Sequence, residues 1–370
     1  MRGQDIQQEE WFSYKTLEER VPVNHPLRTV QVLTNGILKS MDSEFEKLYS
    51  RNGRPSIPPE RLLRAILIQI FYTVRSERQL MEQLDFNLLF RWFVGLNMDE
   101  AVWDHSTFSQ NRDRLLTESL TRDFFNRVVA AAGGYGLLSD EHFSVDGTLI
   151  EAWASQKSFQ SKDGKGKSDD NQDGGNKRDP QIDFKGELRC NDTHASTTDP
   201  ETMLYRKGKG KEARLSYMAH ALMENRHGLV VGVETTQATG TAEREAATKM
   251  CKWNVNPEST LGADKGYDVK EFVNELQLQG INPHIARNIT EKRSSAIAEE
   301  ITHEPGYAIS LRIRKRIEQI FGWSKTIGPM RKTKLRGLTN VATQTLLTFA
   351  AYNLVRLRKL LCLQPITAQA

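Results

Sequence analysis

The chain has 370 residues, enough to bury one full core and leave room for a second domain. Its hydrophobic content of 38% and charged content of 26% are ordinary for a soluble globular protein, and its formal net charge of +4 is too small to indicate a nucleic-acid partner by itself. Three widely separated cysteines, none in a CxxC pair, argue against a disulfide framework or a zinc ribbon. We expect a soluble protein of the reducing cytoplasm.

The first part of the chain is predicted to be helical. Pro58 and Pro59 suit the first turn of a helix, and apolar residues recur at helical spacing through residues 62–71. A later helix is expected to open with Ser106 as a candidate N-cap. We therefore predict an all-helical N-terminal domain over residues 1–135, which binds DNA or forms a dimer.

From about residue 141 the sequence pattern changes from helical spacing to strand-like alternation. Residues 142–146 alternate polar and apolar side chains, which is typical of a strand, whereas 155–198 is polar and glycine-rich and is predicted to be a flexible loop. The remaining elements are expected in this order: a hairpin of strands 215–223 and 228–235, a helix at 242–253, a strand at 260–263, a helix at 269–278, a strand at 281–286, and helices at 310–323 and 340–361. This order predicts an α/β domain over residues 136–361, with flanking helices on a mixed sheet.

Two acidic residues follow short apolar strands. Asp146 is expected to end the first strand and Asp264 the strand at 260–263, which places both acids at the mouth of the sheet. Metal-assisted phosphodiester chemistry requires carboxylates on rigid elements around two divalent cations, and Mg²⁺ prefers such oxygen ligands. The alternative for each residue alone is an aspartate that stabilises a turn or caps a helix.

A third acid stands on the helix predicted at 310–323. Arg314, Glu318 and Lys325 are spaced by four and seven residues, so they share one face if the helix continues. The alternative is an exposed Arg–Glu pair of small energetic value. Glu318 is, however, the only acid between Ser310 and Lys359, a span that holds 12 lysines and arginines. A single carboxylate in a basic segment indicates a metal ligand beside the phosphates of a bound nucleic acid.

Other acids compete for these roles. Asp268 lies beyond a glycine turn after Asp264, and Glu151 is either a second acid near Asp146 or an exposed loop residue. The remaining competitors precede the predicted helix: Glu299, Glu300 and Glu304. We rank Asp268 and these three glutamates below Asp264 and Glu318.

The combination of motifs resembles the bacterial insertion-sequence DDE transposases, specifically the branch named after insertion sequence five. The matching segments are FSVDGTLIEAWAS, NDTHASTTDPETMLYRKGKGKEARLSY, LGADKGYD and RIRKRIEQIFGWSK, with RPSIPPERLLRAILIQ and WDHSTFSQNRDRL nearer the N-terminus. This resemblance covers nearly the whole chain. It implies a ribonuclease-H-like core with Asp146, Asp264 and Glu318 as its catalytic, metal-binding triad.

The resemblance also implies a function, DNA transposition. Mg²⁺, with Mn²⁺ as a substitute, would support cleavage at the element ends and transfer of the 3′-hydroxyl into target DNA. The partners would be double-stranded DNA, as terminal inverted repeats and as target, and a second copy of the chain when DNA is bound. The protein would then associate with the bacterial nucleoid. The alternatives are an inactive or domesticated DNA-binding descendant and a nuclease that cuts without joining.

Several basic residues are expected to contact DNA. The family signature places Arg314 and Lys325 beside phosphates, while its tyrosine position holds Leu311, with Tyr307 one turn earlier. The other expected contacts follow the helix: Arg331, Lys332, Lys334 and Arg336.

Overall fold

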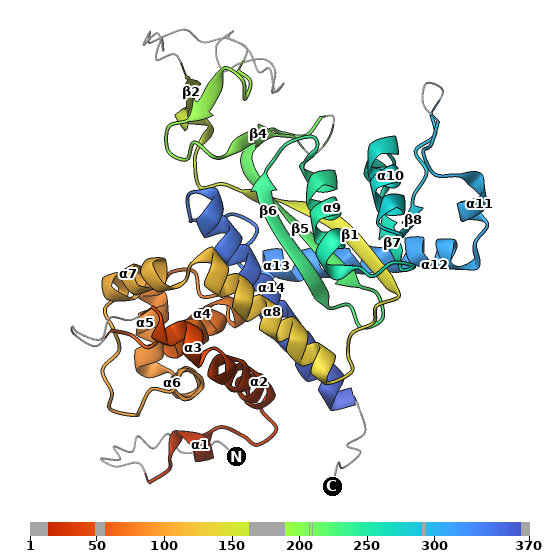
Figure 1. Ribbon diagram of the computed structural model, residues 1–370. Coiled ribbons are helices and arrows are strands. Elements are labelled where there is room, and N and C mark those ends of the chain that lie inside the picture. Colours follow the sequence, from red (N-terminus) through yellow and green to blue (C-terminus); the bar gives the residue numbers. More distant parts are fainter. Residues whose placement is uncertain are drawn as a thin grey trace, which may run out of the picture.

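The computed structural model describes residues 14–48, 56–162, 189–206, 208, 210–290 and 294–363. Its N-terminal part is helical, as predicted (Figure 1). The helices in chain order are α1 (Leu17–Arg20), α2 (Pro26–Ser40), α3 (Asp42–Glu46), α4 (Pro59–Phe71), α5 (Glu77–Phe86), α6 (Leu88–Val94), α7 (His105–Leu115) and α8 (Glu118–Gly134). None of the helices in these ranges is long and apolar enough to cross a membrane.

The ends of these helices follow local capping chemistry. Helix α4 begins at Pro59, as expected, because a proline in the first turn loses no helical hydrogen bond. The expectation for Ser106 is wrong. Asp104 is the N-cap of α7, and its carboxylate accepts a hydrogen bond from the Ser106 backbone N–H at 2.8 Å. An aspartate one position before the first helical residue caps better than a serine inside the first turn.

The rest of the chain forms a mixed α/β arrangement. The six-stranded sheet contains β1 (His142–Glu151), β4 (Met203–Tyr205), β5 (Arg214–Glu224), β6 (Val230–Gln237), β7 (Thr260–Ala263) and β8 (Asn282–Ile285). Strand β5 pairs antiparallel with β1 on one edge and with β4 and β6 on the other, whereas β1, β7 and β8 pair in parallel. The mixed sheet expected from the sequence, including the β5–β6 hairpin, is confirmed.

The polar stretch expected as one flexible loop is structured at both ends. Strand β2 (Phe159–Ser161) pairs antiparallel with β3 (His194–Ser196), and the side chains of Phe159 and His194 stack. The prediction of a loop throughout 155–198 is therefore wrong at these ends, because a few apolar and hydroxyl side chains suffice to bury a short strand pair. Residues 163–188 lie outside the described residues.

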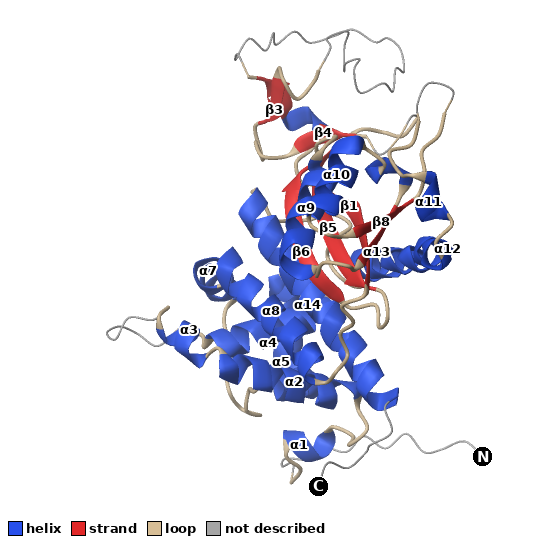
Figure 2. Ribbon diagram, turned by 45° about the vertical axis from the view of Figure 1, so that its right-hand side comes forward, coloured by secondary structure: helices blue, strands red, loops and turns tan. Residues whose placement is uncertain are grey.

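Helices cover both faces of the sheet. Helices α9 (Ala242–Asn254) and α10 (Lys270–Leu278) pack with Val145 and Leu222 in one apolar cluster. On the other face, Ile150 and Ala221 join a larger cluster with α8, α13 (Ile317–Thr326) and α14 (Leu338–Leu363). In Figure 2 the strands lie toward one end of the molecule and the N-terminal helices toward the other.

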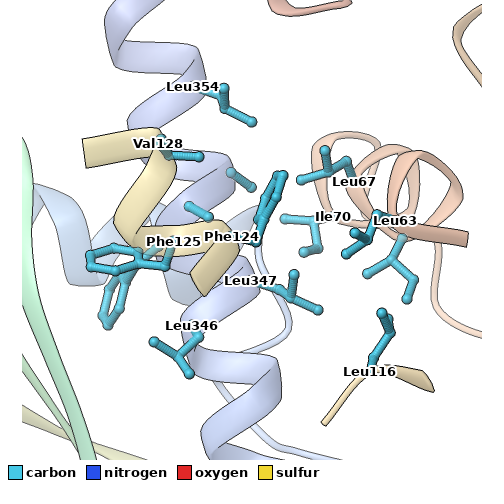
Figure 3. Close-up of a cluster of buried hydrophobic side chains, with 14 of the residues drawn as sticks. Leu63, Leu67, Ile70, Leu116, Phe124, Phe125, Val128, Leu346, Leu347 and Leu354 are labelled. Atoms are coloured by element: carbon cyan, nitrogen blue, oxygen red, sulfur yellow. The ribbon is translucent and has the colours of Figure 1, made fainter. Parts of the chain in front are cut away.

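Helix α14 links the two parts of the chain. Its buried Leu347 and Leu354 lie in one apolar cluster with Phe124 of α8 and Leu67 of α4 (Figure 3). It also packs on β6 and α2. The helical and sheet-containing parts therefore share a core, whatever their boundary; the division into domains 1–135 and 136–361 stays a prediction.

We expect Leu354→Ala to destabilise both parts together. The substitution leaves a cavity where α14 meets α8, at a cost of about 2–5 kcal/mol in the free energy of unfolding. Urea unfolding monitored by circular dichroism and by tryptophan fluorescence should shift as one transition. Lys359→Ala, at an exposed position of the same helix, is the control and should change the free energy by less than about 0.5 kcal/mol. Two separate transitions would contradict the shared core.

Candidate active site

The site is organised by the place where β1 and β7 cease to pair. Their parallel ladder ends at Ser144 and Gly262, and Asp146 and Asp264 each follow two residues later. Strand β1 continues to Glu151 because β5 pairs with it that far, so the prediction that Asp146 ends its strand is wrong. The two aspartates nevertheless stand at the same depth, where the sheet opens between their strands.

The two carboxylates interact electrostatically. Burial raises the pKa of Asp146 to about 6, with further raising by the charges of Asp264 and Glu243; the Gly147 N–H and the Arg314 guanidinium act in the opposite direction. One oxygen of Asp146 accepts a hydrogen bond from the Gly147 N–H at 2.8 Å, and one oxygen of Asp264 accepts from the Gly266 N–H at 2.7 Å. Backbone donors thus fix the orientation of both side chains.

The helix predicted at 310–323 is divided by a 3₁₀ turn. Helix α12 (Pro305–Ile313) leads into the turn Arg314–Arg316, and α13 follows directly. The turn lies directly against β7, because a Cβ added to Gly262 would be 3.5 Å from the Arg314 Cβ, an ordinary contact distance. A short 3₁₀ segment within a helix is frequent at functional positions.

The three signature residues of this helical segment occupy different environments. Arg314 lies near Asp146, as its effect on the pKa of that aspartate shows. Glu318 is exposed in the first turn of α13, and Lys325 is partly buried in the last turn. Within the described ranges, no three or more His, Cys, Asp or Glu side chains are grouped as a metal site. The geometry thus brings together Asp146, Asp264 and Arg314, and leaves Glu318 at the surface.

The aspartate pair has the donor chemistry of a divalent-cation site. Two carboxylates held side by side repel each other, and a cation between them removes this cost. Hard oxygen donors suit Mg²⁺ or Mn²⁺ rather than a thiolate-binding metal. Asp146 and Asp264 would hold such an ion.

The competing acids have structural partners. Both oxygens of the buried Asp268 accept backbone N–H groups, from Asn288 at 2.6 Å and Ala296 at 2.8 Å. Glu151 forms ion pairs with Arg214 and Lys332.

The glutamates before α12 likewise have other partners or are exposed. Glu304 contacts His284 and Asn282, and Glu299 and Glu300 are exposed in α11 (Glu299–Thr302). Tyr307 is buried and donates a hydrogen bond to the Ile285 carbonyl, so it stabilises α12 against β8.

One acid near the pair was not selected from the sequence. Glu243 lies in the first turn of α9 and influences the pKa of Asp146. Acidic residues are common at helix N-termini, where they interact favourably with the helix dipole. Only the packing of α9 against the sheet distinguishes this glutamate from others.

The basic residues expected to contact DNA lie mostly between α13 and α14. Lys332 pairs with Glu151 and lies over the half-exposed Trp153 ring, and Lys334 donates a hydrogen bond to the Arg75 carbonyl of the N-terminal part. Arg331 and Arg336 are exposed. This segment therefore presents cations next to the junction of the two parts.

Known families match both parts of the chain. The family described as Transposase DDE domain matches residues 138–354, and the family described as Transposase domain (DUF772) matches residues 15–114. The first match spans more than half of the chain, so the chain belongs to the family of DDE transposases. Members of this class act in DNA transposition through nuclease and transesterification chemistry and use divalent metals.

Solved structures give weaker likenesses. A piggyBac transposase synaptic complex with hairpin DNA has a TM-score of 0.43 and 8% identity, covering 94% of this chain and 78% of that chain. The Mos1 strand transfer complex has a TM-score of 0.20 and 9% identity, covering 78% and 82%. These scores carry no structural conclusion, and the family assignment rests on the sequence matches.

We expect Asp146→Asn to stabilise the metal-free protein at neutral pH. Since folding raises the pKa of Asp146 from 3.8 to about 6, ionising this group costs stability as the pH rises through that window, by about 2–3 kcal/mol at most. In EDTA, the melting temperature of the variant should exceed that of the wild type at pH 7.5, with the difference shrinking toward pH 4.

Asp140→Asn is the control for this measurement, because Asp140 is an exposed aspartate just before β1. It should leave the melting temperature unchanged at each pH. A variant Asp146→Asn that is less stable than the wild type at pH 7.5 would contradict the electrostatic account of the pair.

Proposed function

We propose that this protein cleaves phosphodiester bonds at the ends of a mobile element and joins the freed 3′-hydroxyls to target DNA. The observation that supports this most directly is the aspartate pair at the opening between β1 and β7, in a chain that belongs to the DDE transposases. We further propose that the fold is ribonuclease-H-like. Its strand order β6-β5-β1-β7-β8, with antiparallel pairs followed by parallel pairs, supports that assignment.

The reaction consists of two in-line displacements at phosphorus. In the first, a water oxygen attacks and the bond from phosphorus to the 3′-oxygen breaks, which frees a 3′-hydroxyl. In the second, that 3′-oxygen attacks a phosphorus of target DNA and displaces the 3′-oxygen of the neighbouring nucleotide. Divalent cations, when bound, polarise the phosphate and lower the pKa of the attacking group.

Each residue of the site has a separate proposed role in these steps. Asp146 and Asp264 would hold the cations from the sheet, and Glu318 would complete the set from the first turn of α13. Arg314, whose charge acts on Asp146, contacts the scissile phosphate, and Lys325 contacts a phosphate further along α13. Positioning by rigid strands is what the chemistry requires, because small displacements of ligands cost large factors in rate.

The partners follow from this chemistry. We propose double-stranded DNA, as terminal inverted repeats and as target, bound along the exposed residues Arg331 and Arg336. A homodimer on DNA would bring two element ends together. On the basis of the motifs quoted above, we also propose that the protein is bacterial and cytoplasmic. We propose that it belongs to the branch named after insertion sequence five.

An inactive DNA-binding descendant is the second candidate. The exposure of Glu318 favours it, because the acids of an active site must converge on the same cations. A cleavage assay separates the two candidates: an inactive descendant binds its terminal repeats and does not nick them with Mg²⁺ or Mn²⁺.

Purified protein with Mn²⁺ should nick DNA that carries the inverted repeats flanking its own gene. We expect Asp146→Asn and Glu318→Gln each to lower the nicking rate by about 10²–10³-fold or more, the effect of removing a preorganised electrostatic group. Glu300→Gln, at an exposed glutamate of α11, should nick at the wild-type rate. Wild-type nicking by Asp146→Asn would refute the assignment of the site.

Arg336→Ala tests the proposed phosphate contacts. The loss of one phosphate contact should reduce the slope of log affinity against log salt concentration by about 1, for specific and random duplexes alike. Fluorescence anisotropy over a series of salt concentrations measures this slope. Lys252→Ala, at an exposed position of α9 on the opposite face of the sheet, should have the wild-type slope. If Arg336→Ala also has the wild-type slope, Arg336 is not part of the DNA interface.

A further inference from the structure

Glu243 approaches the aspartate pair from the face of the sheet opposite to α13. A Cβ added to Gly147 would lie only 2.9 Å from the Glu243 Oε1 and 3.0 Å from the His220 Nδ1. Side chains alternate between faces along a strand, so position 147 points toward α9 while Asp146 points toward α13. The backbone of residues 146 and 147 is therefore what separates the Glu243 carboxylate from that of Asp146.

The opening of the sheet removes the barrier between the two faces. Beyond Ser144 and Gly262 no ladder pair joins β1 to β7, so a group that approaches from α9 can reach the gap where Asp264 also lies. The absence of a side chain at Gly147 leaves room for the Glu243 carboxylate. These two features connect the α9 face with the aspartate pair.

Tyr267 is influenced by the charges of all three acids. Its side chain is buried, and its hydroxyl has no hydrogen-bond partner among the described residues. Burial raises the pKa of Tyr267, and the charges of Glu243, Asp146 and Asp264 raise it further. A buried hydroxyl is therefore exposed to the charges of three carboxylates that approach this part of the sheet.

The neighbouring histidine does not neutralise these charges. His220 is buried, and burial lowers its pKa to about 3, so the ring is neutral at physiological pH. Its Nε2 contacts the Thr236 hydroxyl at 2.8 Å, whereas its Nδ1 is buried and makes no hydrogen bond among the described residues.

We propose that Glu243 is a further carboxylate of the cation site and enters it from α9, opposite the face on which α13 presents Glu318. It binds a divalent cation at the aspartate pair, directly or through a bound water. With ligands from both faces of the sheet, two cations could bind at separate positions around one phosphate. This inference rests on the proposed function, since it assumes a cation between Asp146 and Asp264.

A structural role for Glu243 is the competing explanation. An acid in the first turn of α9 stabilises the helix through its dipole whether or not a cation binds. Glu245 shares that turn but is exposed, so it is a matched control for the dipole effect. The two roles predict different responses to metal.

The test is Mn²⁺ binding by the full-length protein without DNA, measured by titration calorimetry. Glu243→Gln should weaken Mn²⁺ binding by about 10- to 100-fold, the effect expected when a supporting ligand is removed. Glu245→Gln should bind within about twofold of the wild type, and Asp146→Asn should lose binding.

The outcomes separate this inference from the proposed function. Wild-type Mn²⁺ affinity in Glu243→Gln, with binding lost in Asp146→Asn, would overturn the role of Glu243 and leave the site intact. Wild-type affinity in Asp146→Asn would instead refute the cation site itself. If Glu243→Gln does not fold, Glu243→Asp decides: it keeps the charge but shortens the reach, so we expect clearly weaker binding, and unchanged affinity would overturn the proposal.

Discussion

The early end of the ladder between β1 and β7 is the constraint on which the site depends. Because pairing ceases at Ser144 and Gly262, Asp146 and Asp264 follow the last ladder pair at equal spacing, and their charges interact. The pairing of β1 with β5 continues, so the first aspartate is held rigidly in a strand interior. Folding thus places like charges together, at a free-energy cost that a divalent cation relieves.

The remainder of the fold holds this opening in place. Helices α9 and α10 cover one face of the sheet, while α14 ties the other face to the N-terminal helices through a continuous apolar core. The segment from α12 to α13 crosses next to Gly262, and the charge of its Arg314 acts on Asp146. Carboxylates and a guanidinium from distant parts of the sequence therefore lie near the end of the ladder between the central strands β1 and β7.

Patterns within single elements were predictable from the sequence, and contacts between elements were not. Alternation of side chains identified β1, and the turn residues identified the hairpin of β5 and β6. The capping of α7 by Asp104 rather than by Ser106 depends on a shift of two residues that the pattern does not fix. Helix α2 lies in a segment for which no element was predicted, although its buried residues Leu27, Val30 and Ile37 follow helical spacing.

The candidate site shows the same division. Asp146 and Asp264 could be chosen because each ends a short strand-like pattern in the sequence, and Glu318 because it is the single acid in a basic segment. Glu243 could not be chosen, since an acid in the first turn of a helix is ordinary; its place beside Gly147 comes only from tertiary packing. Anomalous diffraction from crystals grown with Mn²⁺ would test the central claim most directly. The account predicts an ion within about 2.5 Å of carboxylate oxygens of both Asp146 and Asp264. Ordered aspartates with no ion between them, at saturating Mn²⁺, would contradict it.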